Sequence, residues 1–281
     1  MQNMVDERFE LAAVIFRLAG ALPYTDLKSD YQREVAEAFA PFAGHKAVNY
    51  AKKLKVGYDQ VFRFAIHIEK RKKDKFALIE DLSSLGHGWN PRRARKFLRL
   101  FNKFYRDTDY AVFFNAHRAL FEQATQKYID EVYSKIDMEW FAKYAGPANF
   151  RCILSLSSGN YGATLNDKIV YSLVCAYADA DVVIHEYCHH FANPLADTFY
   201  EKNEEFKQWC DDSVDRETMP FYGNGWVMGR EYVTRACTIL YGIQHGRDMS
   251  EQFSEEKSIG FKYIEQVYEM ILEEQPWQDK N

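Results

Sequence analysis

The sequence has no long hydrophobic run and few residues that break regular structure. No stretch approaches the ~18 apolar residues of a membrane-spanning helix, so no membrane partner is expected. The 14 glycines and 7 prolines among 281 residues exclude a chain made mostly of loops. The first residues lack the charged, apolar and small-residue layout of a signal peptide, which predicts a cytoplasmic protein. A secreted or periplasmic protein whose signal peptide has been removed would show the same pattern.

The cysteines lack the paired spacing of a thiolate metal site or a disulfide framework. Their number is odd, none belongs to a CxxC pair, and most lie in apolar segments. We therefore expect reduced thiols in the core at Cys152, Cys175, Cys188, Cys210 and Cys237.

Positive charge is concentrated in the first part of the chain. Residues 1–110 hold 21 Lys and Arg against 14 Asp and Glu, and the remaining residues hold 15 against 27, giving the net charge of -5. The segment from Arg92 to Arg106 is basic, but Phe97, Phe101 and Phe104 recur within it at helical spacing. That pattern favours a core-facing helix with a solvated outer face, so nucleic-acid binding is not expected.

Residues 1–110 are predicted to be an all-helical region. Apolar residues recur every three or four positions, and Pro23, the stretch from Pro41 to Gly44, Gly57 and a charged run at 70–75 separate the segments. The expected helices are 7–22, 29–40, 45–54, 58–70, 74–83 and 91–106.

Residues 111–281 contain the predicted strands, at 151–157 and 168–177. A helix is expected to begin at Asp179 or Asp181 and to end at Asn193-Pro194. Further helices are expected at 110–136, 138–144, 195–211, 226–244 and 251–274. The chain is therefore predicted to have a mostly helical α+β fold, with a small sheet in its second part.

The sequence His185-Glu186-Tyr187-Cys188-His189 carries the clearest chemical signal. Two histidines four residues apart lie on one face of a helix, where both can bind one metal ion. Glu186 adjoins the first histidine and is placed to act as a base without binding the metal. Zinc lowers the pKa of a water molecule that it binds, and a carboxylate can then take the proton during attack on a carbonyl. The pattern predicts one Zn²⁺ per chain.

A catalytic zinc site usually has three protein ligands, so a third is expected downstream. Glu231 is favoured because it lies beside an apolar stripe in the predicted helix 226–244, where a buried carboxylate would need a partner. A surface pairing of Glu231 with Arg235, four residues later, is the alternative. The other candidates are Glu201, Glu204, Glu205, Glu217 and His245.

The segments HEYCHHFANPL, GREYVTRACTILY, RFELAAVIFRLAG and LSLSSGNYG resemble a family of uncharacterised bacterial proteins, known only as a domain of unknown function with a zincin-like metallopeptidase core. The chain is also similar to the gluzincins, which combine HExxH with a glutamate on a following helix. The resemblance implies a zincin-like core over 111–281, with His185, His189 and Glu231 as ligands and Glu186 as base. Many gluzincins have an acidic residue four positions after the ligand glutamate, where this chain has Arg235.

Two further features are expected of such a hydrolase. Zincin folds place a sheet edge where a peptide substrate can pair, and the segment with Ser157, Gly159, Asn160 and Tyr161 is the candidate. A group that stabilises the negative charge on the carbonyl oxygen is also needed. The candidates for it, or for support of the metal ligands, are Tyr222, Arg235, Tyr241 and His245.

The sequence therefore predicts a zinc-dependent metallopeptidase that acts on a peptide or protein substrate. A non-peptide amide or ester is an alternative substrate, because the shape of the pocket decides between them. A second alternative is a non-catalytic or inactive zincin-like protein that recognises a partner through its basic helical region.

Overall fold

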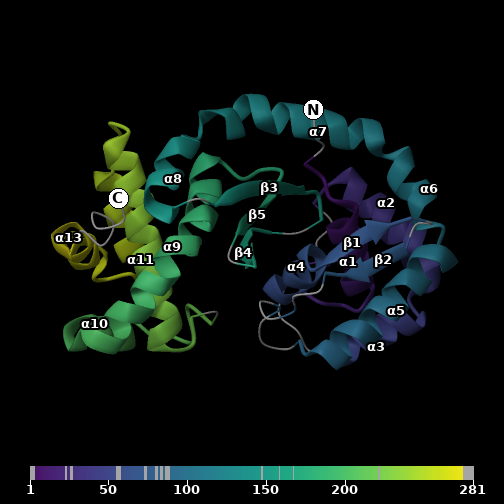
Figure 1. Cartoon of the computed structure of the whole chain (residues 1–281), viewed down its shortest axis with the longest axis horizontal. Coiled ribbons are helices and arrows are strands. Elements are labelled where there is room, and N and C mark those ends of the chain that lie inside the picture. The colour runs from purple at the N-terminus through teal and green to yellow at the C-terminus, as the bar shows by residue number, and fades with distance from the viewer. Residues whose placement is uncertain are drawn as a thin grey trace. The chain divides into compact units, whose positions relative to one another are not determined.

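The structure is a computed structural model, and it describes residues 4–274 apart from 23, 26–27, 55–57, 73–74, 80–81, 83–84, 86–88, 147, 158, 167 and 221. The described chain is mostly helical and contains two small sheets, which confirms the α+β class (Figure 1). It divides into two compact units, each described by itself. Unit 1 comprises residues 1–135 and 149–183, and unit 2 comprises residues 136–148 and 184–281.

These units do not follow the division at residue 110 expected from the sequence, because the predicted sheet belongs to unit 1. The helices of unit 1 are α1 (Glu7–Leu18), α2 (Asp30–Phe39), α3 (Lys46–Leu54), α4 (Tyr58–Ile66), α5 (Pro91–Asp107), α6 (Tyr110–Ala116) and α7 (Arg118–Glu131), with 3-10 turns η1 (Ala40–Phe42) and η3 (Tyr133–Lys135). Its strands are β1 (Ile68–Arg71), β2 (Lys75–Leu78), β3 (Asn149–Ser155), β4 (Tyr161–Leu165) and β5 (Ile169–Cys175).

Helix α1 is the central helix of unit 1. Asp6 begins it by accepting a hydrogen bond from the Arg8 backbone N–H, and every residue from Phe9 to Arg17 is buried. A helix that is buried on all sides is a core element rather than an amphipathic surface helix. The buried carboxylate of Glu10 accepts hydrogen bonds from the Tyr31 and Ser157 hydroxyls, at 3.0 and 2.6 Å. Burial raises the pKa of Glu10 above its ordinary value.

The prediction that residues 1–110 are all-helical is wrong. Strands β1 and β2 form an antiparallel hairpin in place of the end of helix 58–70 and of residues 75–78 of helix 74–83. The side chain of Asn102 on α5 explains why the hairpin is stable as only two strands. Its Oδ1 accepts from the Phe76 N–H at 2.8 Å, and its Nδ2 donates to the Phe76 carbonyl at 2.9 Å. One amide therefore takes the place of a third strand at Phe76.

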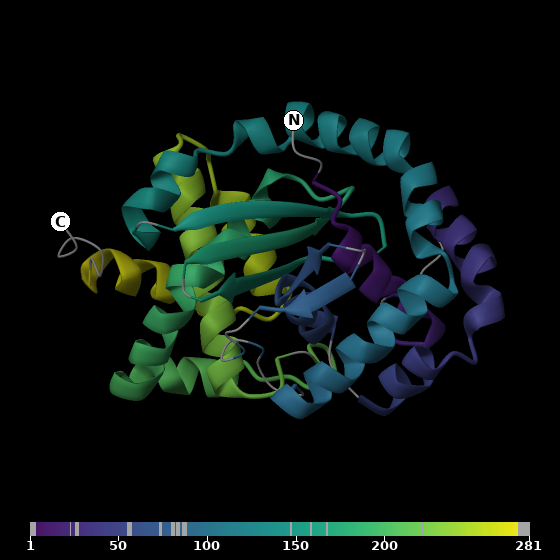
Figure 2. The same ribbon diagram turned by 45° about the vertical axis from the view of Figure 1, so that its right-hand side comes forward.

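The second sheet of unit 1 has the strand order β3-β5-β4, with β5 in the middle (Figure 2). Strand β3 is parallel to β5, in a register that sets Cys152 opposite Ser172. Strand β4 is antiparallel to β5, and Tyr161 lies opposite Leu173. Both β3 and β4 are edge strands of this mixed sheet.

Unit 2 is helical throughout its described elements. They are α8 (Met138–Ala145), α9 (Ala180–Lys202, whose first turn belongs to unit 1), α10 (Glu204–Asp212), α11 (Gly225–Gln244), α12 (Ser250–Ser258) and α13 (Ile264–Glu274). The expected end of a helix at Asn193-Pro194 is wrong, because α9 continues through Pro194. Proline removes one hydrogen bond, but Ala192, Ala196 and Phe199 remain buried along the continuing helix.

Two more predicted helices are divided in the structure. The expected helix 251–274 is interrupted by Gly260, whose φ of +113° is not helical and separates α12 from α13. The expected helix 110–136 is divided at His117 into α6 and α7. Among the residues that the structure describes, no helix combines the length and the apolar character needed to cross a membrane.

Candidate metal centre

His185 and His189 lie one turn apart on α9, in unit 2. Their ring centroids are 4.8 Å apart and the rings are nearly perpendicular. Ile184 and Cys188, which alternate with them along the helix, are buried. These apolar contacts fix the rotation of α9 and leave both imidazoles together on a face where each is about one-fifth exposed.

Glu231 on α11 brings a carboxylate to the two imidazoles. Its Oε1 lies 3.6 Å from His189 Nε2, and its Oε2 lies 3.7 Å from His185 Nε2. These separations are too long for hydrogen bonds. Ligand atoms around a tetrahedral zinc ion lie ~3.3 Å apart, because each is bound at ~2.0–2.1 Å. The atoms are therefore gathered slightly more widely than zinc ligands would be.

The three residues form a donor set of two nitrogens and one carboxylate oxygen. One ligand atom from each residue lies within 4.8 Å of the others, and this group is the one such set found among the described residues. Two histidines and a glutamate are the ligands of a common type of catalytic zinc site, so the chemistry fits zinc. His185, His189 and Glu231 would hold the ion.

The orientation of the His189 ring is fixed by contacts at Nδ1, the nitrogen farther from Glu231. Its Nδ1 lies 3.0 Å from the Thr234 hydroxyl and 3.2 Å from Asn193 Oδ1. When Nδ1 carries the proton and donates it to Asn193, Nε2 presents its lone pair toward Glu231. Burial, followed by the nearby His189 and the Arg235 charge, lowers the pKa of His185. The lowered pKa favours the neutral form of His185, which is the form that binds a metal.

Arg235 occupies the position where many gluzincins carry an acidic residue, and it contacts Glu231 from the side. Its Nε lies 3.7 Å from Glu231 Oε2, and its Nη1 donates to Glu256 Oε2 at 2.6 Å. The same guanidinium lies over the Phe261 ring, and its Nη2 is 3.4 Å from the Tyr222 hydroxyl. Arg235 therefore links the Glu231 carboxylate on α11 to the buried Glu256 carboxylate on α12.

Glu186 follows His185 on α9 and is only 8% exposed. A buried carboxylate has a desolvation cost, which is acceptable where the group acts on a proton or a cation. Its position in the chain suits the role of a base beside the histidines. Zinc, when bound, would polarise a carbonyl and lower the pKa of a water molecule.

The other predicted supporting residues separate into two groups. Tyr222 belongs with the triad, because burial and the Glu231 charge raise the pKa of its hydroxyl. Tyr241 and His245 do not belong with it, because they lie ten and fourteen residues beyond Glu231, ~15 Å or more along α11. The Tyr241 hydroxyl accepts from the Asp137 N–H at 2.7 Å, and His245 Nε2 lies 3.1 Å from Asp137 Oδ2. Both residues thus bind the start of α8.

The alternative third ligands are outside the triad. Among the described residues, the acidic groups gathered with the two histidines include none of the other candidates: Glu201, Glu204, Glu205 and Glu217. All four are exposed to solvent. Helix α10 begins at Glu204, and both glutamates of its first turn, Glu204 and Glu205, face solvent as the charged run EKNEEFK predicts.

The segment expected to pair with a substrate lies in unit 1. Ser157 is buried and donates to Glu10, so its side chain has a structural role. Asn160 Oδ1 accepts from the Cys175 N–H at 2.8 Å, which holds the connection before β4. Gly159 lies in the same connection, and Tyr161 is the first residue of edge strand β4. Substrate pairing along this segment stays a prediction.

Sequence reasoning missed the residues that support the triad. Asn193 lies four residues after His189, and Thr234 lies three residues after Glu231, so helical spacing alone would have found both. Glu256 could not be found in this way, because it lies on a different helix.

Comparison of the chain with protein-family models, with curated proteins and with solved structures gave no match. The resemblance to a zincin-like family therefore stays a prediction, and the geometry of the triad is the observation that bears on function.

Proposed function

We propose that this chain is a zinc-dependent hydrolase that cleaves peptide bonds. The observation that supports the proposal is the convergence of His185 Nε2, His189 Nε2 and the Glu231 carboxylate at 3.6 to 3.7 Å. The long separations and the neutral state favoured for His185 distinguish the arrangement from an ordinary buried ion pair.

In this proposal each residue has one task. His185, His189 and Glu231 would hold the zinc ion, which would polarise the carbonyl and lower the pKa of a water molecule. Glu186 takes a proton from the attacking water and passes it to the nitrogen of the leaving amine as the C–N bond breaks. Tyr222 is the candidate donor to the carbonyl oxygen, because its hydroxyl lies beside Arg235 at the edge of the triad.

The first test is the metal content of the purified chain, measured by elemental analysis. We expect about one zinc per chain, lost in His185→Ala and in Glu231→Ala. Glu201→Ala is the matched control, because this exposed glutamate is outside the triad. Zinc lost with His185→Ala but retained in Glu231→Ala would assign the third ligand elsewhere, and absence of zinc after reconstitution would refute the proposal.

The second test separates binding from catalysis. Glu186→Gln keeps the size of the side chain and removes the base, so it should retain zinc and lose peptide hydrolysis by ~10³-fold or more. Full activity in this variant would refute the role of Glu186. Parallel screening of peptide, amide and ester libraries decides the class of substrate.

A non-catalytic binding role is favoured by one separate observation. Helix α5 exposes seven basic side chains, from Arg92 to Arg106, against the single acidic residue Asp107. Arg92, Arg95 and Arg99 also line a groove of about 670 Å³ beside β2. Zinc-free protein that binds an acidic partner through these residues, and has no hydrolase activity with zinc, would support this alternative.

A further inference from the structure

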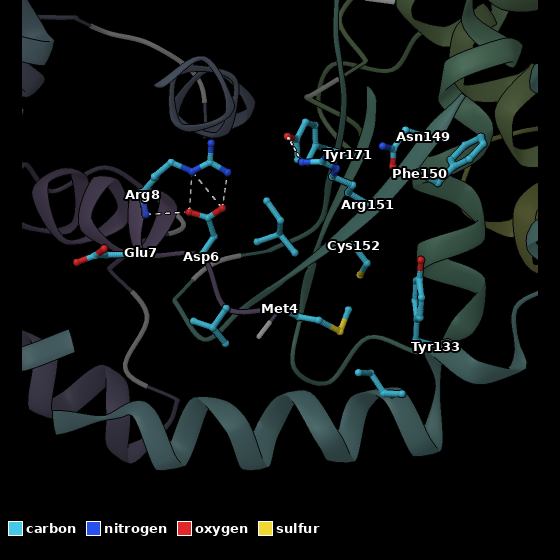
Figure 3. Close-up of a pocket in the computed structure, with 13 residues that line it drawn as sticks. Met4, Asp6, Glu7, Arg8, Tyr133, Asn149, Phe150, Arg151, Cys152 and Tyr171 are labelled. Carbon is cyan, nitrogen blue, oxygen red and sulfur yellow. Dashed lines mark hydrogen bonds and ion pairs between the residues drawn. The ribbon is translucent and has the colours of Figure 1, made fainter. Parts of the chain in front are cut away.

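A pocket in unit 1 is lined by none of the residues assigned to the candidate metal centre. Its volume is about 740 Å³, within the range of ~300–1,000 Å³ that is common for small-ligand sites. The start of the described chain, the end of α7 and the strands β3 and β5 surround it (Figure 3). The lining includes five consecutive residues of β3, 149–153, so the pocket follows the edge of this strand rather than one face of it.

The edge of β3 presents the backbone groups of Cys152 to the pocket. The Asn149 N–H donates to Lys168 on the β5 side, so alternate residues direct their backbone toward β5. The intervening residues face outward, as the 3.0 Å hydrogen bond from the Leu154 N–H to the Met4 carbonyl shows. Cys152 lies two residues before Leu154 and faces the same way. Within the described residues, its N–H and C=O have no hydrogen-bond partner.

One end of the pocket carries an uncompensated positive charge. Arg8 is paired with Asp6 and donates to the Ile68 carbonyl, and Glu7 is paired with Lys70. Arg151 has no acidic partner among the described residues. Its Nη1 lies 3.5 Å from the Tyr171 hydroxyl, and Figure 3 shows it alongside that ring. A ligand with one negative charge would neutralise the Arg151 guanidinium at this end of the pocket.

The opposite end is apolar. It is lined by Met4, Ile129, Cys152 and the Tyr133 ring. Figure 3 shows the side chains of Met4, Cys152 and Tyr133 pointing away from the Arg151 side chain. Burial raises the pKa of the Cys152 thiol, so the group is neutral and contributes an apolar surface. The pocket therefore combines one charge, one free strand-edge amide and an apolar end.

We propose that this pocket binds a short peptide with a free C-terminal carboxylate and an apolar terminal side chain. The carboxylate pairs with Arg151 and the Tyr171 hydroxyl. A peptide amide exchanges hydrogen bonds with the N–H and C=O of Cys152, as an added strand does. The apolar side chain lies between Met4 and Ile129. The site is independent of the zinc proposal, because it uses no residue of the triad.

The test is calorimetric titration of the whole chain with acetyl-alanyl-leucine, in a buffer that contains a chelator so that no metal centre contributes. We expect binding of the free acid in the submillimolar range, and binding about tenfold weaker for the same peptide with a C-terminal amide. Equal affinity for acid and amide, or no binding in the millimolar range, would overturn the proposal.

Variants locate the site. Arg151→Gln should weaken binding of the acid by about tenfold and abolish the preference for acid over amide. Arg118→Gln, which makes the same change at an exposed arginine of α7 that does not line the pocket, is the control and should change neither. Cys152→Pro removes the outward N–H without affecting the bonds to β5 and should also weaken binding. If Cys152→Pro does not fold, Ile129→Trp fills the apolar end and serves instead. Unchanged affinity in Arg151→Gln would place the bound peptide elsewhere and refute the assignment.

Discussion

The pair formed by Arg235 and Glu256 offers a sharp test of how Glu231 is held beside the two histidines. Their side chains are 18% and 7% exposed, and their contact of 2.6 Å is a buried, charge-assisted hydrogen bond. The substitution Glu256→Gln keeps the shape and one acceptor, while it removes the negative charge. The guanidinium is then balanced by Glu231 alone, whose Oε2 lies 3.7 Å from Arg235 Nε.

Two effects are expected from this change. Breaking a buried ion pair costs ~3–5 kcal/mol, and because glutamine can still accept a hydrogen bond we expect ~2–3 kcal/mol in the free energy of unfolding. Arg235 should also draw Glu231 away from the two histidines, which weakens zinc binding by ~10-fold.

Urea unfolding in the presence of a chelator measures the first effect, and competition with a zinc-binding dye measures the second. Glu255→Gln is the control, because it makes the same chemical change at an exposed site on α12. If Glu256→Gln is as stable as Glu255→Gln, Arg235 does not depend on Glu256. If stability falls but zinc affinity is unchanged, the arginine is not coupled to Glu231.

Two further predictions concern unit 1. Asn102→Ala leaves the Phe76 N–H and C=O without partners and should lower the free energy of unfolding by ~2–3 kcal/mol, measured in urea against the exposed control Asn49→Ala. The pKa of Glu10 is raised in the folded chain above its ordinary value of 4.5, so folding takes up a proton and stability is lost as pH rises above 4.5. Glu10→Gln should lose less stability than the parent between pH 4.5 and 7, and parallel pH profiles of the two proteins would show that Glu10 does not titrate in this way.

The sequence allowed the long elements to be predicted, because each carries its own local signal. Helix α11 was expected at 226–244 and begins at Gly225, where Asn224 accepts a hydrogen bond from the Val227 N–H. The hairpin was missed because four residues are too few to show strand alternation, and because its stabilising partner Asn102 is 26 residues from Phe76. The predicted end of α9 at Asn193-Pro194 is wrong because the burial of Ala196 and Phe199 outweighs the one hydrogen bond that the proline removes.

In the candidate site too, contacts within one helix could be predicted from the sequence, and contacts between helices could not. The spacing of His185 and His189 is a property of one helix, so their shared face could be read directly from the sequence. Glu231 was favoured because it lies beside an apolar stripe, and the structure brings it to the two histidines. The bridge through Arg235 to Glu256 depends on how α11 and α12 pack, and no pattern within either helix indicates it.

The amide of Asn102 also has a consequence for the behaviour of the protein in concentrated solution. A strand whose outer N–H and C=O groups are free is a template on which the strand of another molecule can pair. In β2, those groups of Phe76 are already bonded within the chain. One side chain thereby protects β2 from edge-to-edge pairing at Phe76, and the exposed, charged Lys75 at the start of the strand adds to this protection.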